Sequence, residues 1–186
     1  MTISRTGYSG ERGYEIFVTA AHAPDIWDNI LEHGADMGIM PTSFAALDKV
    51  RVEAALLFYP YDMTDDHTPW EVGLDWVLSR KKDDFRGRDA VFAAEGKERF
   101  RVCGISVDHY EALEGGETLS VNGAEVGTVI SPAYSHRMGK SLALVHLGLD
   151  STASGTELEV AGDGVSYNAT VESIPFLDPQ KAKTHA

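Results

Sequence analysis

A glycine-rich segment near the start of the chain holds the first residue types that could bind or react with a small molecule. Residues 7–13 contain three glycines, Tyr8 lies among them, and Glu15 follows in a β-favouring run. A phenol combines a face for stacking with one hydrogen-bonding tip, and a carboxylate can accept two neighbouring N–H protons. The same pattern also has a structural explanation, in which Tyr8 fills space under the turn and Glu15 faces solvent. For Glu15, the residues alone favour the solvent-facing orientation.

Arg51 and the histidines are the other candidates for chemistry. Arg51 borders the apolar face of a predicted helix, where it can pair with Glu53, cover the core with its stem or bind an anion. Cys103 lies within a predicted strand and is interpreted as a small core residue rather than a nucleophile. No metal site is predicted, because no tight ligand pair such as H-x-x-x-H occurs among the histidines considered, His33, His67, His109, His136 and His146.

The charge balance excludes some classes of partner. The chain of 186 residues carries 29 acidic and 16 basic side chains, a net charge of −13, so nucleic-acid and anionic-membrane binding are disfavoured. No apolar run approaches the ~18 residues of a membrane-spanning helix, and no secretory signal is visible. A single cysteine excludes an internal disulfide, which fits a reducing compartment, and we expect a cytoplasmic protein.

The elements that would position these side chains form an α+β pattern in the first part of the chain. Residues 3–20 are predicted to form two strands joined by the glycine-rich turn. Residues 23–33 follow as a helix, and a second helix begins after Thr42 or Ser43 as its N-cap. Residues 68–71, with the sequence T-P-W-E, have capping-box spacing and predict a short turn of helix.

The second part of the chain is β-rich. Asn122-Gly123 indicates a type I′ hairpin, and residues 161–164 mark a second hairpin. A small antiparallel barrel or sandwich is indicated by six short predicted strands at 99–108, 117–121, 125–131, 142–147, 156–161 and 165–174. The expected domains are a partial α+β domain at 1–84, a connecting segment at 85–97, the barrel at 98–178 and a loose tail at 179–186.

Ordered motifs resemble those of the aminomethyltransferase family, which includes the glycine cleavage T-protein and tetrahydrofolate-dependent demethylases. Residues 5–15 resemble the family's R-T-G-Y-[ST]-G-E-x-G-x-E, and residues 68–76 resemble its T-P-x-E-x-G-L-x-W. Further matches follow in the family's order at 47–54, 85–88, 126–131, 155–160 and the closing Pro175-Phe176. The resemblance therefore covers nearly the whole chain.

The resemblance implies one-carbon transfer from a small methylated donor to N5 of tetrahydrofolate, in a folate site at the centre of three domains. It implies that Glu15 holds the pterin by accepting two adjacent protons, and that Tyr8 lines the pocket as the candidate catalytic residue for proton transfer. It places Arg51 on the folate side and Tyr59 in the pocket. The fold class implied is α+β: the C-terminal half of a folate-binding domain, then a small antiparallel β-barrel.

The resemblance also predicts that half of the family's sequence is absent, including the aspartate on which T-protein catalysis depends. We therefore expect either a separate polypeptide that carries the N-terminal half or a longer protein of which this chain is a fragment. A half domain exposes strand edges and a core face that require a cover.

Two departures from the family's pattern leave the donor open. Residues 10–13 read G-E-R-G where G-E-D-G is common, and residues 45–48 read A-A-L-D where G-A-R-D is common. A methylamine, betaine, sulfonium or aryl ether donor is therefore favoured as much as glycine cleavage. The alternative function is a noncatalytic folate-binding or structural subunit that completes a partner chain. One noncatalytic branch carries K-G-C-Y-x-G-Q-E, which R-T-G-Y-S-G-E does not match.

Overall fold

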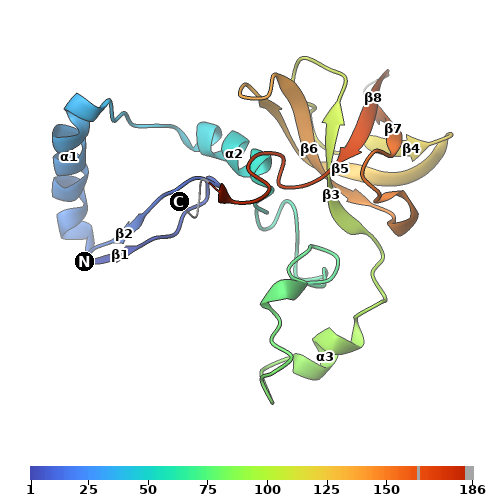
Figure 1. Cartoon of the computed structure of the whole chain (residues 1–186), viewed down its shortest axis with the longest axis horizontal. Helices are drawn as coiled ribbons and strands as arrows, with labels where there is room; N and C mark the ends of the chain where they lie inside the picture. The colour runs from blue at the N-terminus through green and yellow to red at the C-terminus, as the bar shows by residue number, and fades with distance from the viewer. Residues whose placement is uncertain (163, 183–186) are drawn as a thin grey trace.

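The computed structural model describes residues 1–162 and 164–182 and shows a β-barrel with an extended lobe at one side and an arm below it (Figure 1). The lobe contains, in chain order, β1 (Thr2–Ser4), β2 (Glu15–Phe17), a 3₁₀ helix (Ala20–His22), α1 (Ala23–Gly34), a second 3₁₀ helix (Ala35–Met37) and α2 (Phe44–Glu53). β1 and β2 form a two-stranded antiparallel sheet. These elements confirm the predicted strand, turn, strand and helix order.

Helix α2 connects the lobe to the barrel. It begins after Ser43, whose hydroxyl accepts a hydrogen bond from the backbone N–H of Ala46 at 3.2 Å, as predicted for an N-cap. Its last three residues, Arg51, Val52 and Glu53, are all buried. Val52 packs against Leu144 of the barrel, so the C-terminal end of α2 sits on the outer face of the barrel wall.

The arm contains a 3₁₀ helix (Asp75–Val77) and α3 (Arg88–Ala93). The predicted short turn of helix at residues 68–71 is present as one hydrogen-bonded turn, in which the backbone N–H of Val72 donates to the Thr68 carbonyl at 3.3 Å, and no longer helix follows it. The capping-box bonds do form, because the backbone N–H of Thr68 donates to Glu71 Oε2 at 2.8 Å. Gly73, at φ +68°, then turns the chain away before a helix can continue.

Glu71 ties this turn to the start of the barrel. Its buried carboxylate accepts hydrogen bonds from the backbone N–H of Arg99 at 3.1 Å and from Arg99 Nε at 2.7 Å. The guanidinium group of Arg99 lowers the pKa of Glu71 from the usual 4.5 to about 2. The charged form of this carboxylate is therefore stabilised by folding.

Replacing Glu71 by Gln is expected to lower the free energy of unfolding at pH 7 by about 2 kcal/mol, because hydrogen bonds to a charged group are lost. The folded-state pKa lies below the unfolded one, so the contribution is complete above pH 4.5 and is lost as the pH falls toward about 2. Urea unfolding of wild type and Glu71→Gln from pH 7 to pH 3 measures this. A stability difference that stays constant over that range would contradict the assignment.

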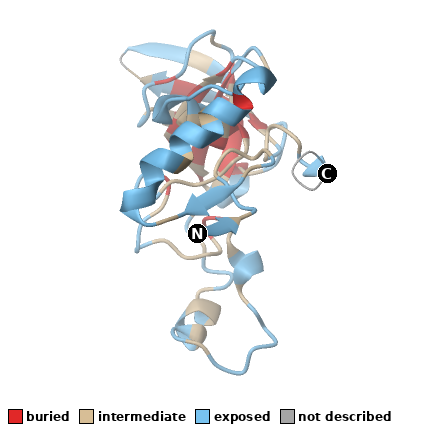
Figure 2. Cartoon of the chain, turned by 90° about the vertical axis from the view of Figure 1, so that its left-hand side faces the viewer, coloured by how far each residue is buried: buried red, intermediate tan, exposed pale blue. Residues whose placement is uncertain are grey.

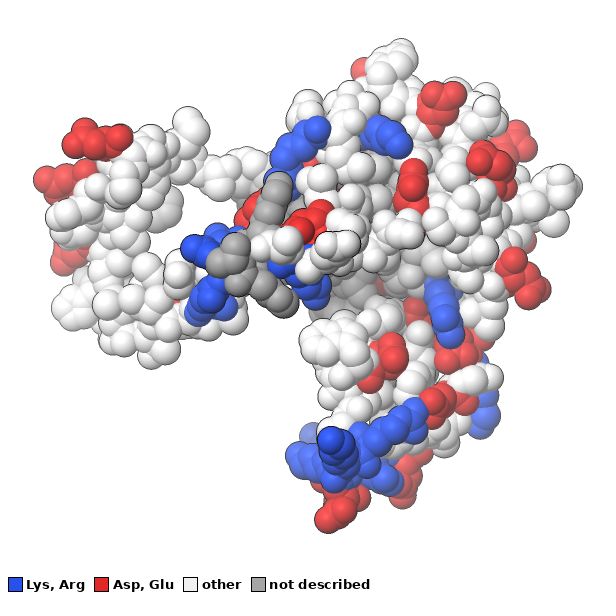
Figure 3. Space-filling view, in the orientation of Figure 1, with Lys and Arg blue, Asp and Glu red and all other residues white. Residues whose placement is uncertain are grey.

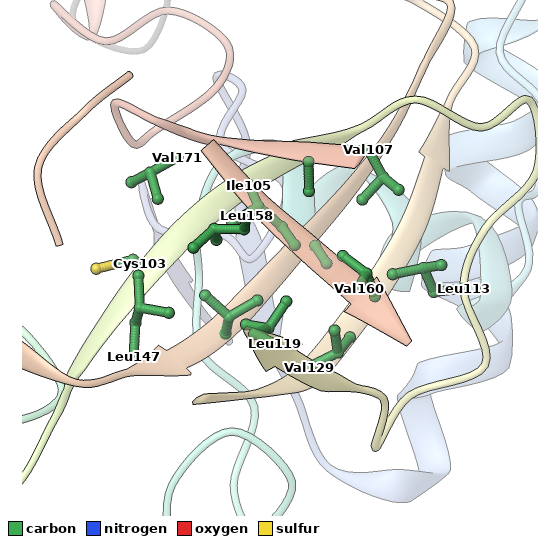
Figure 4. Packing of buried hydrophobic residues seen from close by; sticks show 13 residues of the cluster. Cys103, Ile105, Val107, Leu113, Leu119, Val129, Leu147, Leu158, Val160 and Val171 are labelled. Carbon is green, nitrogen blue, oxygen red and sulfur yellow. The ribbon is translucent and has the colours of Figure 1, made fainter. Parts of the chain in front are cut away.

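The barrel is closed and antiparallel, with strand order β3-β6-β5-β4-β7-β8. Its strands are β3 (Arg101–Val107), β4 (Thr118–Val121), β5 (Ala124–Ser135), β6 (Lys140–Leu147), β7 (Glu157–Gly162) and β8 (Val165–Glu172), with a 3₁₀ helix (Leu149–Ser151) after β6. Alternate residues point inward and fill the barrel, as Figure 4 shows for Ile105, Leu119, Val129 and Val160. The α+β fold class with a C-terminal barrel is confirmed.

Strand β5 contains a register shift between Val129 and Ser131. Val129 packs in the barrel core, whereas Ala133 packs outside with Val52 of α2. A bulge of this kind inserts a residue and reverses which side chains face inward. The shift therefore aims Ser131, Ala133 and Ser135 at the lobe. The strand runs to Ser135, beyond the predicted end at residue 131.

The hairpins follow the predicted turns where the structure describes them. Asn122 and Gly123 have φ of 51° and 80°, as a type I′ turn between β4 and β5 requires. At the second predicted hairpin, Gly162 pairs with Val165, and Asp163 lies outside the described residues, as do residues 183–186 of the expected tail.

Burial is concentrated in the barrel. Figure 2 shows buried residues there, whereas the lobe that faces the viewer is exposed. Of the described residues in β1, β2 and α1, Gly34 alone is buried. Apolar side chains of the lobe are left on its surface: Met1, Ile3, Tyr14, Ile16, Phe17, Trp27, Ile30, Met37, Ile39, Met40 and Phe44. Within residues 1–162 and 164–182, no helix has the length and apolar character needed to cross a membrane.

Candidate ligand site

A cavity of about 810 Å³ lies between the lobe, the arm and the outer wall of the barrel. Most of its walls come from four segments, residues 5–13, 54–57, 72–76 and 174–181, and Met63 and Val102 complete the lining. This volume is within the range of small-molecule pockets. The walls mix apolar groups, such as Leu56 and Trp76, with charged ones, so the cavity offers both apolar and polar contacts to a small ligand.

We call residues 7–13 the glycine loop. It packs so closely on the C-terminal end of α2 that a Cβ atom added at Gly10 would lie 2.3 Å from Ala54 Cβ. Gly10 also has φ of +70°, a backbone conformation that glycine adopts at little cost. Close packing on α2 therefore explains why this turn between the two strands needs a glycine at position 10. The glycine loop also places Tyr8, Glu11 and Arg12 in the cavity lining.

Tyr8 lines the cavity, and its hydroxyl is held by the chain. The hydroxyl donates to the backbone carbonyl of Leu57 at 2.5 Å, and the Leu56 carbonyl lies at 3.3 Å. Burial raises the pKa of Tyr8, which the nearby Arg51 lowers in part. A phenol with a raised pKa whose proton is bound to a carbonyl is a poor base near neutral pH. Tyr8 can therefore place a ring against a ligand or act through its neutral hydroxyl.

Glu15 lies on β2 and is exposed. Its carboxylate accepts a hydrogen bond from the hydroxyl of Thr6. Thr6 lines the cavity, whereas Glu15 is outside the lining. The structure therefore places the predicted pterin-binding carboxylate at the edge of the cavity, one contact from its wall. In this chain by itself, Glu15 therefore faces solvent, which is the orientation that the residues alone favour.

Arg51 belongs to a buried ion pair rather than to the cavity wall. Its guanidinium group pairs with Asp62, donates to Ser131 Oγ at 2.8 Å and pairs with Asp48 at 2.8 Å. The side chains of Arg51 and Asp62 are 4% and 0% exposed. Arg51 does not pair with Glu53, the partner considered from the sequence. Its contacts join α2 to β5, and its predicted place on the folate side stays a prediction.

Tyr59 lies on the surface beside a small aromatic group. It is exposed, and it is outside the cavity lining. The neighbouring Phe58 and Tyr61 rings stack at 5.5 Å, and Phe58 also contacts Tyr8 at 6.3 Å between ring centroids. The structure therefore brings Tyr8 and Glu15 near one cavity edge, and leaves Arg51 and Tyr59 outside its lining. The predicted binding roles of these residues stay predictions.

Several cavity residues were not singled out from the sequence. Trp76 lies in the T-P-x-E-x-G-L-x-W motif, and a bulky aromatic residue inside a family motif is the signal that could have found it. The segment 174–181 returns along the barrel to the cavity, so that Lys181, assigned to the loose tail, is part of the lining. No feature of the sequence indicates this return.

The electrostatic character of the chain is uneven. Acidic side chains are scattered over the barrel, whereas the lower end of the arm carries Lys and Arg with acidic side chains beside them, and further Lys and Arg lie near the centre of the view (Figure 3). The cavity lining includes Arg5, Arg12 and Lys181. Cys103 is buried in the barrel, where burial raises its pKa to about 11 and leaves no reactive thiolate. Across residues 1–162 and 164–182, no group of three or more His, Cys, Asp or Glu is placed to hold a metal ion.

The chain thus combines an α+β lobe and a closed barrel that border a cavity of small-molecule size, and family models agree with this architecture. The GCVT N-terminal domain matches residues 1–82, and the glycine cleavage T-protein C-terminal barrel domain matches residues 101–178. Together the two matches span the lobe, part of the arm and the barrel.

Three curated proteins are similar to this chain over nearly its whole length. The heme-dependent oxidative N-demethylase gamma subunit of Ectopseudomonas mendocina is 44% identical, over 99% of this chain and 51% of that protein. The trimethylamine-oxide aldolase of Ruegeria pomeroyi is 35% identical, over 98% of this chain and 24% of that protein. The aminomethyltransferase of Symbiobacterium thermophilum is 36% identical, over 95% of this chain and 48% of that protein.

A solved structure shares the fold. The glycine cleavage system aminomethyltransferase T from Bartonella henselae superposes with a TM-score of 0.87 at 26% identity, over 95% of this chain and 50% of that one. The chain thus belongs to the aminomethyltransferase (glycine cleavage T-protein) family and corresponds to the C-terminal portion of its members. It spans about half the length or less of the curated relatives described above.

Proposed function

We propose that this chain forms part of an enzyme that transfers a methyl or aminomethyl group from a small methylated donor to tetrahydrofolate. The observation that carries the proposal is the glycine loop, which has the family's motif and forms a wall of the cavity with Tyr8. Membership of a family of transferases and demethylases supports one-carbon chemistry in general. We propose a methylated amine as the donor class, because two similar proteins are named for N-demethylation and for trimethylamine oxide.

The residues of this chain would bind and orient tetrahydrofolate. The cavity volume suits a pterin, Tyr8 offers a ring to stack on it, and Glu15 at the edge offers two acceptor oxygens for adjacent N–H groups. Bound tetrahydrofolate supplies a nucleophilic nitrogen that accepts the one-carbon unit. The contribution of this chain is orientation and exclusion of water, which can account for a large part of a rate enhancement. Tyr8 is the proposed residue for proton transfer, in which its hydroxyl would exchange the Leu57 carbonyl for a group of the ligand as its hydrogen-bond partner.

The apolar surface of the lobe leads us to propose a partner. Many large apolar side chains of the lobe are exposed, and contiguous apolar surface of this kind marks interaction sites. We propose that a polypeptide with the N-terminal half of the family fold covers β1, β2 and α1, either as a separate chain or as part of a longer one. The similar gamma subunit of the N-demethylase is, by its name, a component of an assembly. A cover at this position would also enclose Glu15.

A second candidate function is a noncatalytic folate-binding or structural subunit that completes a partner chain. The burial pattern supports this candidate as well. The lobe has almost no core of its own, so it needs a partner polypeptide packed against it whether or not the chain takes part in catalysis.

Calorimetry with tetrahydrofolate under reducing conditions tests the proposal, on the chain alone and with a polypeptide carrying the N-terminal half. We expect binding with the partner and an affinity at least about tenfold weaker in Glu15→Ala, because charge-assisted hydrogen bonds are lost. Glu125→Ala is the control, since Glu125 is an exposed strand glutamate on the barrel. Binding that is indifferent to Glu15, or no binding even with the partner, would leave the structural subunit as the better assignment.

A further inference from the structure

A single arginine of the barrel contacts both the end of α2 and the glycine loop. Arg137 lies in the connection between β5 and β6, where the backbone N–H of Gly139 donates to the Ser135 carbonyl at 2.8 Å and that of Met138 donates to Ser135 Oγ at 3.1 Å. These bonds fix the turn that carries Arg137. The side chain of Arg137 is 41% exposed and reaches two carboxylates outside the barrel.

The first carboxylate is the buried Glu53 at the end of α2. Glu53 accepts hydrogen bonds from Ser135 Oγ at 2.6 Å and from Arg137 Nε at 2.8 Å, and a second guanidinium nitrogen also contacts it. Both guanidinium nitrogens donate to the same oxygen, Glu53 Oε2, while Ser135 occupies Oε1, so charge-assisted bonds fix the carboxylate and the guanidinium relative to each other. Glu53 therefore holds Arg137 in one orientation.

The second carboxylate is Glu11 of the glycine loop. Arg137 Nη1 donates to Glu11 Oε1 at 2.5 Å. Glu11 lines the cavity, but Arg137 does not. The hydrogen bonds with Glu53 and then with Glu11 raise the pKa of Arg137, so the arginine stays charged. The loop thus has an electrostatic contact to the barrel in addition to the packing of Gly10 on Ala54.

We propose that Arg137 is a positioning residue for ligand binding: oriented by Glu53, it holds Glu11 and thereby fixes the glycine loop that forms a wall of the cavity. The inference rests on the proposed function only for the identity of the ligand. A residue outside the cavity would then control affinity through the order of the loop. Glu11 could also touch a ligand directly, so the test must separate these two routes.

Hydrogen exchange of the backbone amides of residues 7–13 measures the order of the loop without any ligand. In Glu11→Gln we expect exchange about two- to fivefold faster, which corresponds to the loss of an exposed ion pair. Glu95→Gln is the matched control, because Glu95 forms a similar exposed pair with Arg80 on the arm. The control should leave loop exchange unchanged. Unchanged loop exchange in Glu11→Gln would overturn the proposal.

Tetrahydrofolate affinity separates the two routes. We expect Arg137→Lys, which keeps the charge but loses the two-point contact with Glu53, to weaken binding about two- to fivefold. In the Arg137→Lys/Glu11→Gln double variant the losses should not add, because both remove the same bond. Additive losses, or faster loop exchange with unchanged affinity, would overturn positioning. Absence of folate binding in wild type would refute the proposed ligand. Hydrogen exchange of the backbone amides of residues 7–13 would still test whether Arg137 positions the loop.

Discussion

Replacing Asp62 by Asn is expected to destabilise the chain by about 3–5 kcal/mol, because it leaves the buried guanidinium of Arg51 without its main counter-charge. Asp62 is fully buried and accepts hydrogen bonds from Arg51, from Ser131 and from the backbone N–H of Phe58 at 2.8 Å. Asn keeps the shape but not the charge. Asp48 remains as a partner of Arg51, but it is half exposed and compensates weakly.

Urea unfolding followed by fluorescence measures this loss. Asp89→Asn is the control, because Asp89 forms a 3.3 Å pair with Arg88 while its side chain is 98% exposed. We expect the control to change stability by less than ~1 kcal/mol. If Asp62→Asn were as mild as the control, the pair would not hold α2 on the barrel, and the folate-side role of Arg51 would gain support.

Arg51 also shows where inference from sequence stops. Its position beside an apolar helix face was visible, and three uses of an arginine there were open. The choice among them depends on Asp62 and Ser131, which lie 11 and 80 residues away. Ser131 faces Arg51 because of the register shift in β5, and a shift of one residue reverses every side chain beyond it. No local pattern specifies such a shift.

The barrel, by contrast, was largely predictable. The turn at Asn122-Gly123 needs two residues with positive φ, and few residue types other than Asn and Gly supply them. Alternation of apolar residues then fixes which side of each strand faces inward, as for Leu158 and Val160 in β7. The choice between a barrel and a sandwich was left open, since closure depends on the pairing of β3 with β8 across most of the domain.

The cavity could be predicted only in part, because several separated segments build its walls. The glycine loop was identified through its motif and its turn chemistry. The contribution of residues 174–181 was not, because it depends on how the chain leaves β8 and packs over β3. Gly104 of β3 allows that packing: a Cβ atom there would lie 2.3 Å from Ile174 Cγ2. A glycine inside a strand can indicate a close approach, but it does not name the approaching segment.

Replacing Gly10 by Ala is expected to displace the glycine loop from α2 and to cost about 2–4 kcal/mol of loop stability. Two effects add. Alanine at φ +70° costs ~1 kcal/mol, and its methyl group would lie 2.3 Å from Ala54 Cβ, an overlap that costs ~1–3 kcal/mol or forces the loop to move. Because the loop carries Tyr8, tetrahydrofolate affinity should fall at least about tenfold.

Gly38→Ala separates the two effects, because Gly38 has a similar φ of +76° but an added Cβ would meet no atom within 4 Å. It should show the backbone cost alone and leave ligand affinity unchanged. Adding Ala54→Gly to Gly10→Ala removes the overlapping methyl group and should restore most of the affinity, although the backbone cost remains. If the double variant were no better than Gly10→Ala, close packing of the loop on α2 would not be what shapes the cavity, and backbone strain alone would explain the loss.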